Sequence, residues 1–322
     1  MNFMALCYHY VRNQNNQFPR ILGTRIEDFE KNIAVIKNKF NMISQDDILE
    51  SYYAEKNEIG YEKGMLFTFD DGLSDHFEAA KILFKNNIKA IFFIPTCIIT
   101  EQLPANPTII HYTIAEFGIT MFLKFFHRAL KYYKVNDDRY FINFNKGIDD
   151  PWETIRKIKN IFKYFLENSV SRSILLYIYK NLLLKKYPDA LKIMHLGESE
   201  IKEILKMGHH IGVHTHSHIS VGPSKLSSKE KKIELVRPKQ ILEKKFNVKI
   251  NSFSYPFGER LDCLNSKSLP KELKQYKIIF TVEENFNTFK TSPLELGRYQ
   301  PHSKDTTKSL IKNLEKIMSK KI

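Results

Sequence analysis

Continuous apolar runs alternate with amphipathic segments in the first part of the chain. Residues 2–11, 64–71 and 88–96 are apolar without a regular polar alternation, which is typical of strands buried on both faces. Between them, residues 22–40 and 74–87 repeat apolar positions with helical spacing. This pattern predicts parallel strands whose connecting helices cover the outside of the sheet.

The alternation stops at about residue 98 and resumes at about residue 195. The intervening segments are aromatic and lysine-rich, and their helical stripe Ile155, Ile158, Ile161, Phe162 and Phe165 is interpreted as internal packing. After residue 195 helices and strands alternate again, with a short helix expected near Leu269 to Gln275. We predict an α/β barrel of about seven strands from residues 1–97 and 195–322, with a helical insertion at 98–194.

Polar side chains stand where the predicted strands end. In a parallel α/β barrel the carboxyl ends of the strands form the functional face. The candidates at these ends are His9, Asp70, Asp71, His214, His216, His218, the turn from Tyr255 to Gly258, and Arg298.

Asp70 and Asp71 are adjacent carboxylates at one strand exit. By themselves they would be typical of a turn or a helix start, where acidic side chains are common. Burying both costs free energy unless a cation or a proton resolves their repulsion. His214 and His218, four residues apart, supply two imidazoles that can converge on one ion. Two imidazoles and one carboxylate leave coordination positions open, as in catalytic metal sites.

We therefore predict one bound divalent metal ion. Zinc is the first choice from this ligand set, although Fe²⁺, Co²⁺ and Ni²⁺ also accept two imidazoles and a carboxylate. Such an ion would provide hydroxide near neutral pH, which leaves the second carboxylate free to act as a base.

The segments "TFDDG", "HTHSH" and "YPFG", in this order, resemble the polysaccharide deacetylases, carbohydrate esterase family 4 with its NodB-homology domain. The resemblance covers about residues 3–100 and 195–300. It implies a distorted (β/α) barrel that removes an N-acetyl or other N-acyl group from an amino sugar. "CYHYV" is similar to a segment of the branch that has an N-terminal Tyr-His pair.

The resemblance also implies roles for individual residues. It makes Asp70 the catalytic base, Asp71, His214 and His218 the metal ligands, and Thr215 a brace of the metal loop. The Phe257 backbone N–H becomes an oxyanion donor, with Tyr255 and Arg298 as further oxyanion or substrate contacts. The family's third motif begins with an Arg where this chain has Ser254, and we expect Arg298 to replace that cation. We assign the general acid to His9 rather than His302. No clear fourth motif is found.

The net positive charge of the chain indicates what kind of ligand it binds. A formal charge of +14 fits an anionic ligand, but no nucleic-acid-binding signature accompanies it. No export signal and no long transmembrane stretch are recognised, so we expect a cytoplasmic protein acting on a nucleotide- or lipid-linked glycan precursor. The three cysteines form no recognisable framework. A basic amphipathic helix from about Thr306 is expected to pack on the barrel, with peripheral membrane contact as the alternative.

Three other functions stay open at this point. The missing third-motif Arg would suit a catalytically inactive, sugar-binding barrel. A deformylase of a lipid-linked amino sugar would use the same chemistry. A phosphohydrolase with Asp70 as nucleophile is disfavoured, because Gly72 stands where the second Asp of that class is required.

Overall fold

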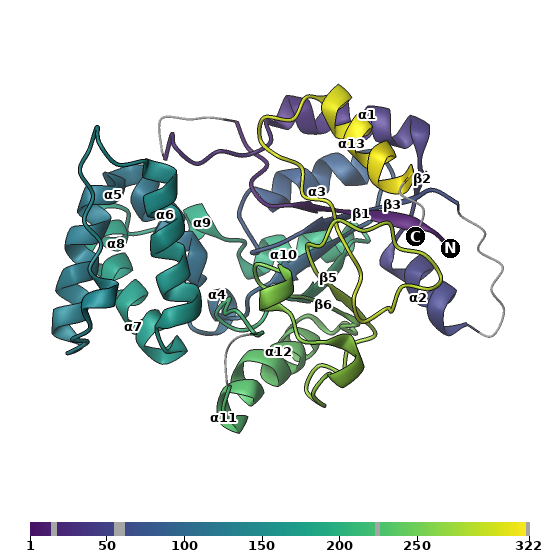
Figure 1. The fold of residues 1–322 in the computed structure, drawn as a ribbon. Helices are drawn as coiled ribbons and strands as arrows, with labels where there is room; N and C mark the ends of the chain where they lie inside the picture. Colours follow the sequence, from purple (N-terminus) through teal and green to yellow (C-terminus); the bar gives the residue numbers. More distant parts are fainter. Residues whose placement is uncertain (14–17, 55–61, 223–225, 320–322) are drawn as a thin grey trace.

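A parallel β-sheet curled into an incomplete barrel forms the centre of the protein (Figure 1). The computed structural model describes residues 1–13, 18–54, 62–222 and 226–319. The strands are β1 (Phe3–Tyr8), β2 (Asn41–Met42), β3 (Gly64–Phe69), β4 (Ala90–Ile94), β5 (His210–Val213), β6 (Ser252–Ser254) and β7 (Ile278–Phe280). They follow the order β1-β3-β4-β5-β6-β7, with β2 on β3, and every pairing is parallel. The predicted distorted barrel is confirmed.

An irregular segment lies between β7 and β1. Leu296 pairs with Phe280 of β7, and Tyr299 pairs with Leu6 of β1, both in parallel bridges. This segment brings Arg298 between the two ends of the sheet, close to the carboxyl ends of the strands. The closure therefore positions a charged side chain that is far from the other site residues in the sequence.

Helices cover the outside of the barrel. They are α1 (Ile26–Lys39), α2 (Gln45–Tyr53), α3 (His76–Lys85), α4 (Cys97–Thr100), α10 (Glu198–Lys206), α11 (Ser228–Lys231), α12 (Arg237–Phe246) and α13 (Thr307–Ser319). The apolar face of α13, including Leu310 and Leu314, is buried in the main core, and α13 lies beside α1 (Figure 1). The prediction that this helix packs on the barrel is confirmed.

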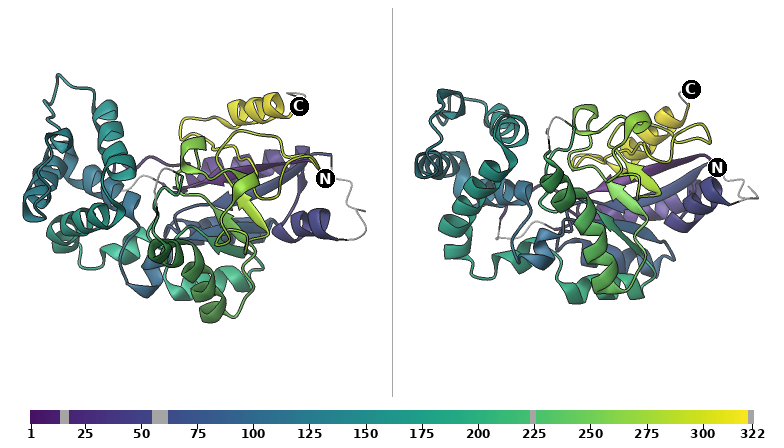
Figure 2. Two further views of the ribbon diagram at one scale, coloured as in Figure 1. Left: turned by 60° about the horizontal axis from the view of Figure 1, so that its bottom comes forward. Right: turned by 90° about the horizontal axis from the view of Figure 1, so that it is seen from below.

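A group of helices between β4 and β5 has a hydrophobic core of its own and lies to one side of the barrel (Figure 2). It contains α5 (Asn106–Tyr132), α6 (Pro151–Asn160), α7 (Asn168–Ile178), α8 (Leu184–Lys186) and α9 (Ala190–Met194), with π-helical turns after α6 and α7. Phe18, from the loop after β1, joins this core, whereas Ile98 and Ile99 belong to the barrel core. The boundaries of the insertion stay a prediction.

Helix α5 is long and apolar enough to cross a membrane by length and composition, the one such helix in the described part of the chain. Just over half of its most apolar window, 56%, is buried inside the protein. Gly118 interrupts it with φ 80°, so two shorter helices meet at a kink. Because α5 packs along α7 in the helical core, burial within the protein accounts for its apolar sequence.

The sequence prediction was wrong about a helix near Leu269 to Gln275. Residues 271–275 form turns instead, closed by bonds from the Leu273 and Lys274 N–H groups to the Pro270 carbonyl. Both N–H groups share one carbonyl acceptor, so only this turn forms before the chain enters β7 at Ile278.

Buried His209 gives the fold a dependence on pH. Its Nδ1 accepts a hydrogen bond from the Ala90 N–H (3.1 Å), and its Nε2–H donates to the Ala80 carbonyl oxygen (3.0 Å), which ties β4 to α3. Burial lowers the pKa of His209 to about 4. An unfolded chain, with a histidine pKa of about 6.5, binds this proton first, so the free energy of unfolding falls as pH drops from about 6.5 to about 4.

We expect His209→Gln to remove part of this dependence. Within that window protonation of His209 lowers the free energy of unfolding by up to about 1.4 kcal/mol per pH unit, and the variant does not show this contribution. Urea unfolding of both proteins at about pH 7, 5.5 and 4.5 measures the two slopes. Equal slopes would contradict the prediction.

Candidate active site

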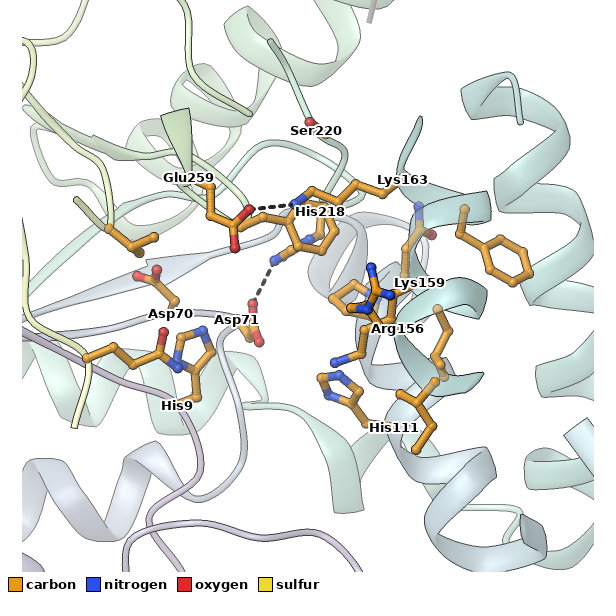
Figure 3. A pocket seen from close by; sticks show the side chains of 18 of the residues that line it. His9, Asp70, Asp71, His111, Arg156, Lys159, Lys163, His218, Ser220 and Glu259 are labelled. Atoms are coloured by element: carbon orange, nitrogen blue, oxygen red, sulfur yellow. Dashed lines mark ion pairs between the residues drawn. The ribbon is translucent and has the colours of Figure 1, made fainter. Parts of the chain in front are cut away.

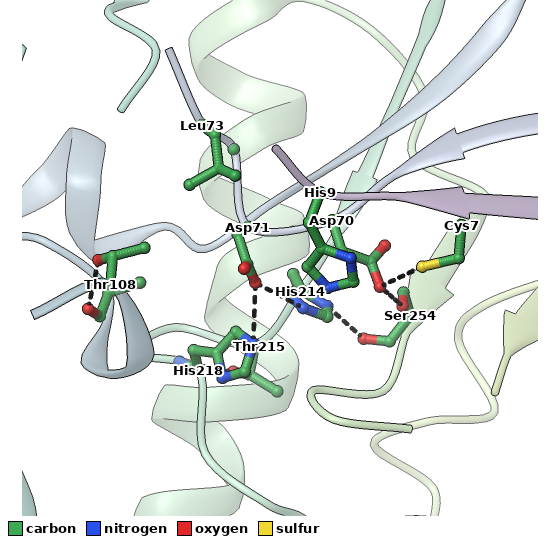
Figure 4. Close-up of polar contacts among 12 residues, drawn as sticks. Cys7, His9, Asp70, Asp71, Leu73, Thr108, His214, Thr215, His218 and Ser254 are labelled. Atoms are coloured by element: carbon green, nitrogen blue, oxygen red, sulfur yellow. Dashed lines mark hydrogen bonds and ion pairs between the residues drawn. The ribbon is translucent and has the colours of Figure 1, made fainter. Parts of the chain in front are cut away.

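The exits of β1, β3, β5 and β6 bring the predicted polar residues together at one end of the barrel (Figure 4). Asp70 and Asp71 follow β3 directly, and His214 follows β5. All three are buried, with at most 2% of their surface exposed. Parallel strands explain this convergence, because their carboxyl ends meet on the same face of the sheet.

Asp71, His214 and His218 form a buried triad. Asp71 Oδ1 lies 3.4 Å from His214 Nε2 and 2.9 Å from His218 Nε2. Asp71 Oδ1 and His214 Nε2 have no hydrogen-bond partner among the described residues. Although burial raises it, the pKa of Asp71 is held well below its usual value by His218 and His214.

These residues fit a divalent metal ion. Each offers one ligand atom, and the ligand atoms lie within 4.8 Å of one another. His214 Nδ1–H donates to the Ser254 carbonyl oxygen (2.9 Å), which fixes the tautomer and leaves Nε2 free to bind a metal. Unpartnered donors and acceptors at this depth would be costly without an ion.

The backbone around the triad has an unusual conformation. Asp71, Thr215, His218 and Phe257 all have positive φ, between 57° and 77°. Such strain persists only where the surrounding structure enforces it, and it is concentrated at functional sites. Thr215 supports the loop here, because its Oγ1 accepts a hydrogen bond from the His218 N–H (3.0 Å).

Asp70 has a different partner from its neighbour. Arg298 donates two hydrogen bonds to Asp70, from Nη1 to Oδ1 (2.8 Å) and from Nη2 to Oδ2 (2.7 Å). Although burial raises it, the pKa of Asp70 lies below its ordinary value because of the Arg298 charge. The predicted replacement of the third-motif Arg by Arg298 is thus present, and the Ser254 hydroxyl accepts a further bond from Arg298 (2.8 Å).

A cavity of about 830 Å³ opens over these residues. His9, Asp70, Asp71, His218 and Phe257 line its barrel side. The His9 side chain is partly exposed, and its Nδ1 has no hydrogen-bond partner among the described residues. A ligand in the cavity would therefore meet Asp70, Asp71, His218 and the His9 imidazole together.

Two predicted contacts lie elsewhere. Tyr255 and Arg298 were grouped with Phe257 as oxyanion or substrate contacts, but neither lines the cavity. Tyr255 points into the barrel core and packs against Phe253, because alternation along the chain after β6 turns it inward. Arg298 lies fully buried, bonded to Asp70.

The other candidate histidines do not belong to the triad. His216 contacts Thr96 Oγ1 through its Nδ1 (2.9 Å) and Glu101 Oε1 through its Nε2 (3.0 Å), away from the triad. His210 bonds Gln45, away from the site. His302 lines the cavity but is exposed.

The sequence prediction missed the opposite wall of the cavity. His111 of α5 and Arg156 and Lys159 of α6 line it (Figure 3). Trp152 of α6 also lines the cavity. Helical periodicity identifies the apolar face of α6 but not which part of the barrel the rest of the helix meets.

A family model and solved structures can now be compared with this geometry. The polysaccharide deacetylase model matches residues 130–278. The chain is thus similar to the polysaccharide deacetylase family over a little under half of its length. The matched stretch includes His214, His218 and Phe257, and the fold adds Asp70, Asp71 and Arg298 from outside it. The domain match, together with the geometry of the site, indicates a carbohydrate deacetylase, a hydrolase of amide bonds.

Solved structures share the fold. The deacetylase PplD of Streptococcus pyogenes, in complex with acetate, is 16% identical, with a TM-score of 0.60 and 98% of each chain covered. A polysaccharide deacetylase of Bacillus cereus is 15% identical, with a TM-score of 0.57 over 98% of this chain and 69% of that one. IcaB from Ammonifex degensii is 14% identical, with a TM-score of 0.55 over 98% and 97%. A search of curated proteins gives no significant match.

We expect metal binding to separate the histidines of this loop. Removing a ligand in His214→Ala or His218→Ala should weaken metal retention by at least the 10- to 100-fold typical of losing an outer-shell partner. His216→Ala is the matched control, because His216 bonds Thr96 and Glu101 instead of the triad. Elemental analysis after equilibration with Zn²⁺ should find about one ion per chain in the parent and the control only. Equal metal content in all four proteins would contradict the assignment.

Proposed function

We propose that this protein is a metal-dependent N-deacetylase of amino sugars, with Asp70 as its base. One observation carries the proposal: two adjacent buried carboxylates have separate partners, Arg298 for Asp70 and two histidines for Asp71. A divalent ion held by Asp71, His214 and His218 would act as a Lewis acid toward the acyl carbonyl and would lower the pKa of water.

The chain's own residues supply the remaining steps. Asp70, kept ionised by Arg298, takes a proton from the water that adds to the acyl carbon. The Phe257 N–H donates to the oxygen that becomes negative. His9, as imidazolium, gives its proton to the sugar nitrogen as the C–N bond breaks, which releases acetate and a free amine. The positive φ of Phe257 (64°) supports this, because it turns the peptide out of the extended conformation at the cavity wall.

The substrate we propose is a phosphate-linked precursor, such as a nucleotide- or lipid-linked N-acyl amino sugar. The formal charge of +14 favours an anionic substrate. A cytoplasmic location would suit such a precursor. Zinc is the proposed ion, and the branch with an N-terminal Tyr-His segment is the proposed subgroup.

Asp70→Asn should lower kcat by about 10²- to 10⁴-fold, because an amide cannot take the proton. Metal content should be unchanged, since Asp70 is not a ligand in the proposed site. Acetate release from UDP-N-acetylglucosamine, N-acetylglucosamine 1-phosphate and chitooligosaccharides measures turnover. A variant with near-normal turnover would overturn the role of Asp70.

The parent protein separates the alternatives in the same assay. Metal binding without acetate release, but with formate release from N-formyl analogues, would identify a deformylase. Metal and sugar binding with neither product would favour a non-catalytic sugar-binding barrel.

His9→Gln tests the general acid. We expect kcat to fall by about 10²- to 10⁴-fold with metal retained, because the imidazole that would protonate the departing amine is lost. His302→Gln is the control, since His302 lines the same cavity but is exposed. A larger loss in the His302 variant than in the His9 variant would reverse the assignment.

A further inference from the structure

One face of α6 and the turn that follows it forms the cavity wall opposite the barrel residues. Trp152, Arg156, Lys159 and Lys163 recur at helical spacing and all line the cavity. Figure 3 shows Arg156 and Lys159 across the cavity from His9 and Asp71. The wall is cationic, with an aromatic ring at one end.

Lys163 is neutralised by the protein. Its Nζ lies 2.7 Å from Asp262 Oδ2 and 4.4 Å from the centre of the Phe257 ring. Lys157, which does not line the cavity, is paired with Glu153 Oε1 at 3.0 Å. These two lysines have partners that hold them in place.

Arg156 and Lys159 have no such partners. Within residues 1–13, 18–54, 62–222 and 226–319, no hydrogen bond or ion pair is made by either cationic group. Lys159 is partly buried, and burial lowers its pKa although the charge of Asp71 opposes this. Once Asp71 binds a cation, Lys159 would keep no anion nearby. A partly buried cation without a counter-charge is unfavourable, so a ligand that supplies an anion would gain from meeting it.

We propose that Arg156 and Lys159 form an anion subsite that binds a phosphate attached to the amino sugar. The inference rests on the proposed function and deepens it by assigning the residues that select the substrate. Arginine binds phosphate through two parallel N–H donors, and lysine adds a point charge beside it. Trp152, 67% exposed at the cavity edge, offers a ring face to the sugar or to the group beyond the phosphate.

The size of the cavity agrees with this substrate. At about 830 Å³ it lies in the upper part of the range for drug-sized ligands, and a single N-acetyl amino sugar would leave much of it unfilled. The acyl group would lie at the barrel wall, next to Asp70, while the phosphate reaches α6. A neutral monosaccharide would leave the α6 wall without a partner.

Kinetics of Lys159→Met and Arg156→Gln test the subsite. For N-acetylglucosamine 1-phosphate and UDP-N-acetylglucosamine, each variant should raise KM about tenfold or more, because a charge-assisted hydrogen bond is lost. With neutral chitotriose, KM and kcat should stay within about twofold of the parent. Lys157→Met, on the same helix but outside the cavity, is the control and should match the parent with every substrate.

Tryptophan fluorescence gives a readout that does not depend on turnover. The chain has one tryptophan, Trp152, which lines the cavity. In Asp70→Asn protein, titration with UDP-N-acetylglucosamine should change this fluorescence, and adding Lys159→Met should weaken the apparent binding about tenfold. Binding should also weaken with added salt, as expected for a partly exposed phosphate contact.

The outcomes separate the subsite from the proposed function. Equal effects of Lys159→Met on phosphate-bearing and neutral substrates, or phosphate binding that is unchanged in the variant, would overturn the subsite and leave the deacetylase intact. Near-normal turnover of Asp70→Asn would overturn the proposed mechanism, whatever the binding results. The simple 1-phosphate, the nucleotide and a polyprenyl-diphosphate-linked sugar should all depend on Lys159. The one with the highest kcat/KM in the parent identifies the source of the phosphate.

Discussion

The active-site end of this protein depends on the burial of two adjacent carboxylates. Asp70 and Asp71 are each about 2% exposed, and two negative charges so close would oppose folding if both lacked partners. The structure supplies each carboxylate with a different partner. A guanidinium neutralises Asp70 through two bonds, and two imidazoles converge on Asp71. One carboxylate is thereby kept as a fixed anion, while the other becomes part of a ligand set.

This separation depends on how the barrel is closed. Arg298 lies between Leu296 and Tyr299, which pair with β7 and β1. Removing one member of a buried ion pair typically costs about 3–5 kcal/mol, so the segment that carries Arg298 couples the closure of the sheet to the charge of Asp70. Ser254, at the end of β6, contributes both its hydroxyl to Arg298 and its carbonyl to His214. The same residue therefore links Arg298, the partner of Asp70, to His214.

The helical part of the chain completes the cavity and is attached to its edge. Asp262 accepts hydrogen bonds from the Tyr164 hydroxyl (3.3 Å) and the Ser220 hydroxyl (2.5 Å), and it also pairs with Lys163. These residues come from the turn after α6, the loop that carries His218, and the loop that follows Phe257. One buried carboxylate thus ties the helical wall to both loops of the site. The geometry of the wall and the geometry of the catalytic end are consequently linked.

The sequence alone predicted the longer strands and most of their alternation with helices, although it missed β2 and placed a helix near Leu269 to Gln275 that does not form. It also indicated the set Asp70, Asp71, His214 and His218. These features depend on local periodicity, strand exits and short motifs. The tertiary structure alone decided that Tyr255 faces the core and that α6 supplies Arg156 and Lys159 to the cavity, and it gave the predicted cation Arg298 its place behind Asp70. These placements depend on packing between segments far apart in the chain. Local pattern reports which face of an element is buried, but not which other element covers it.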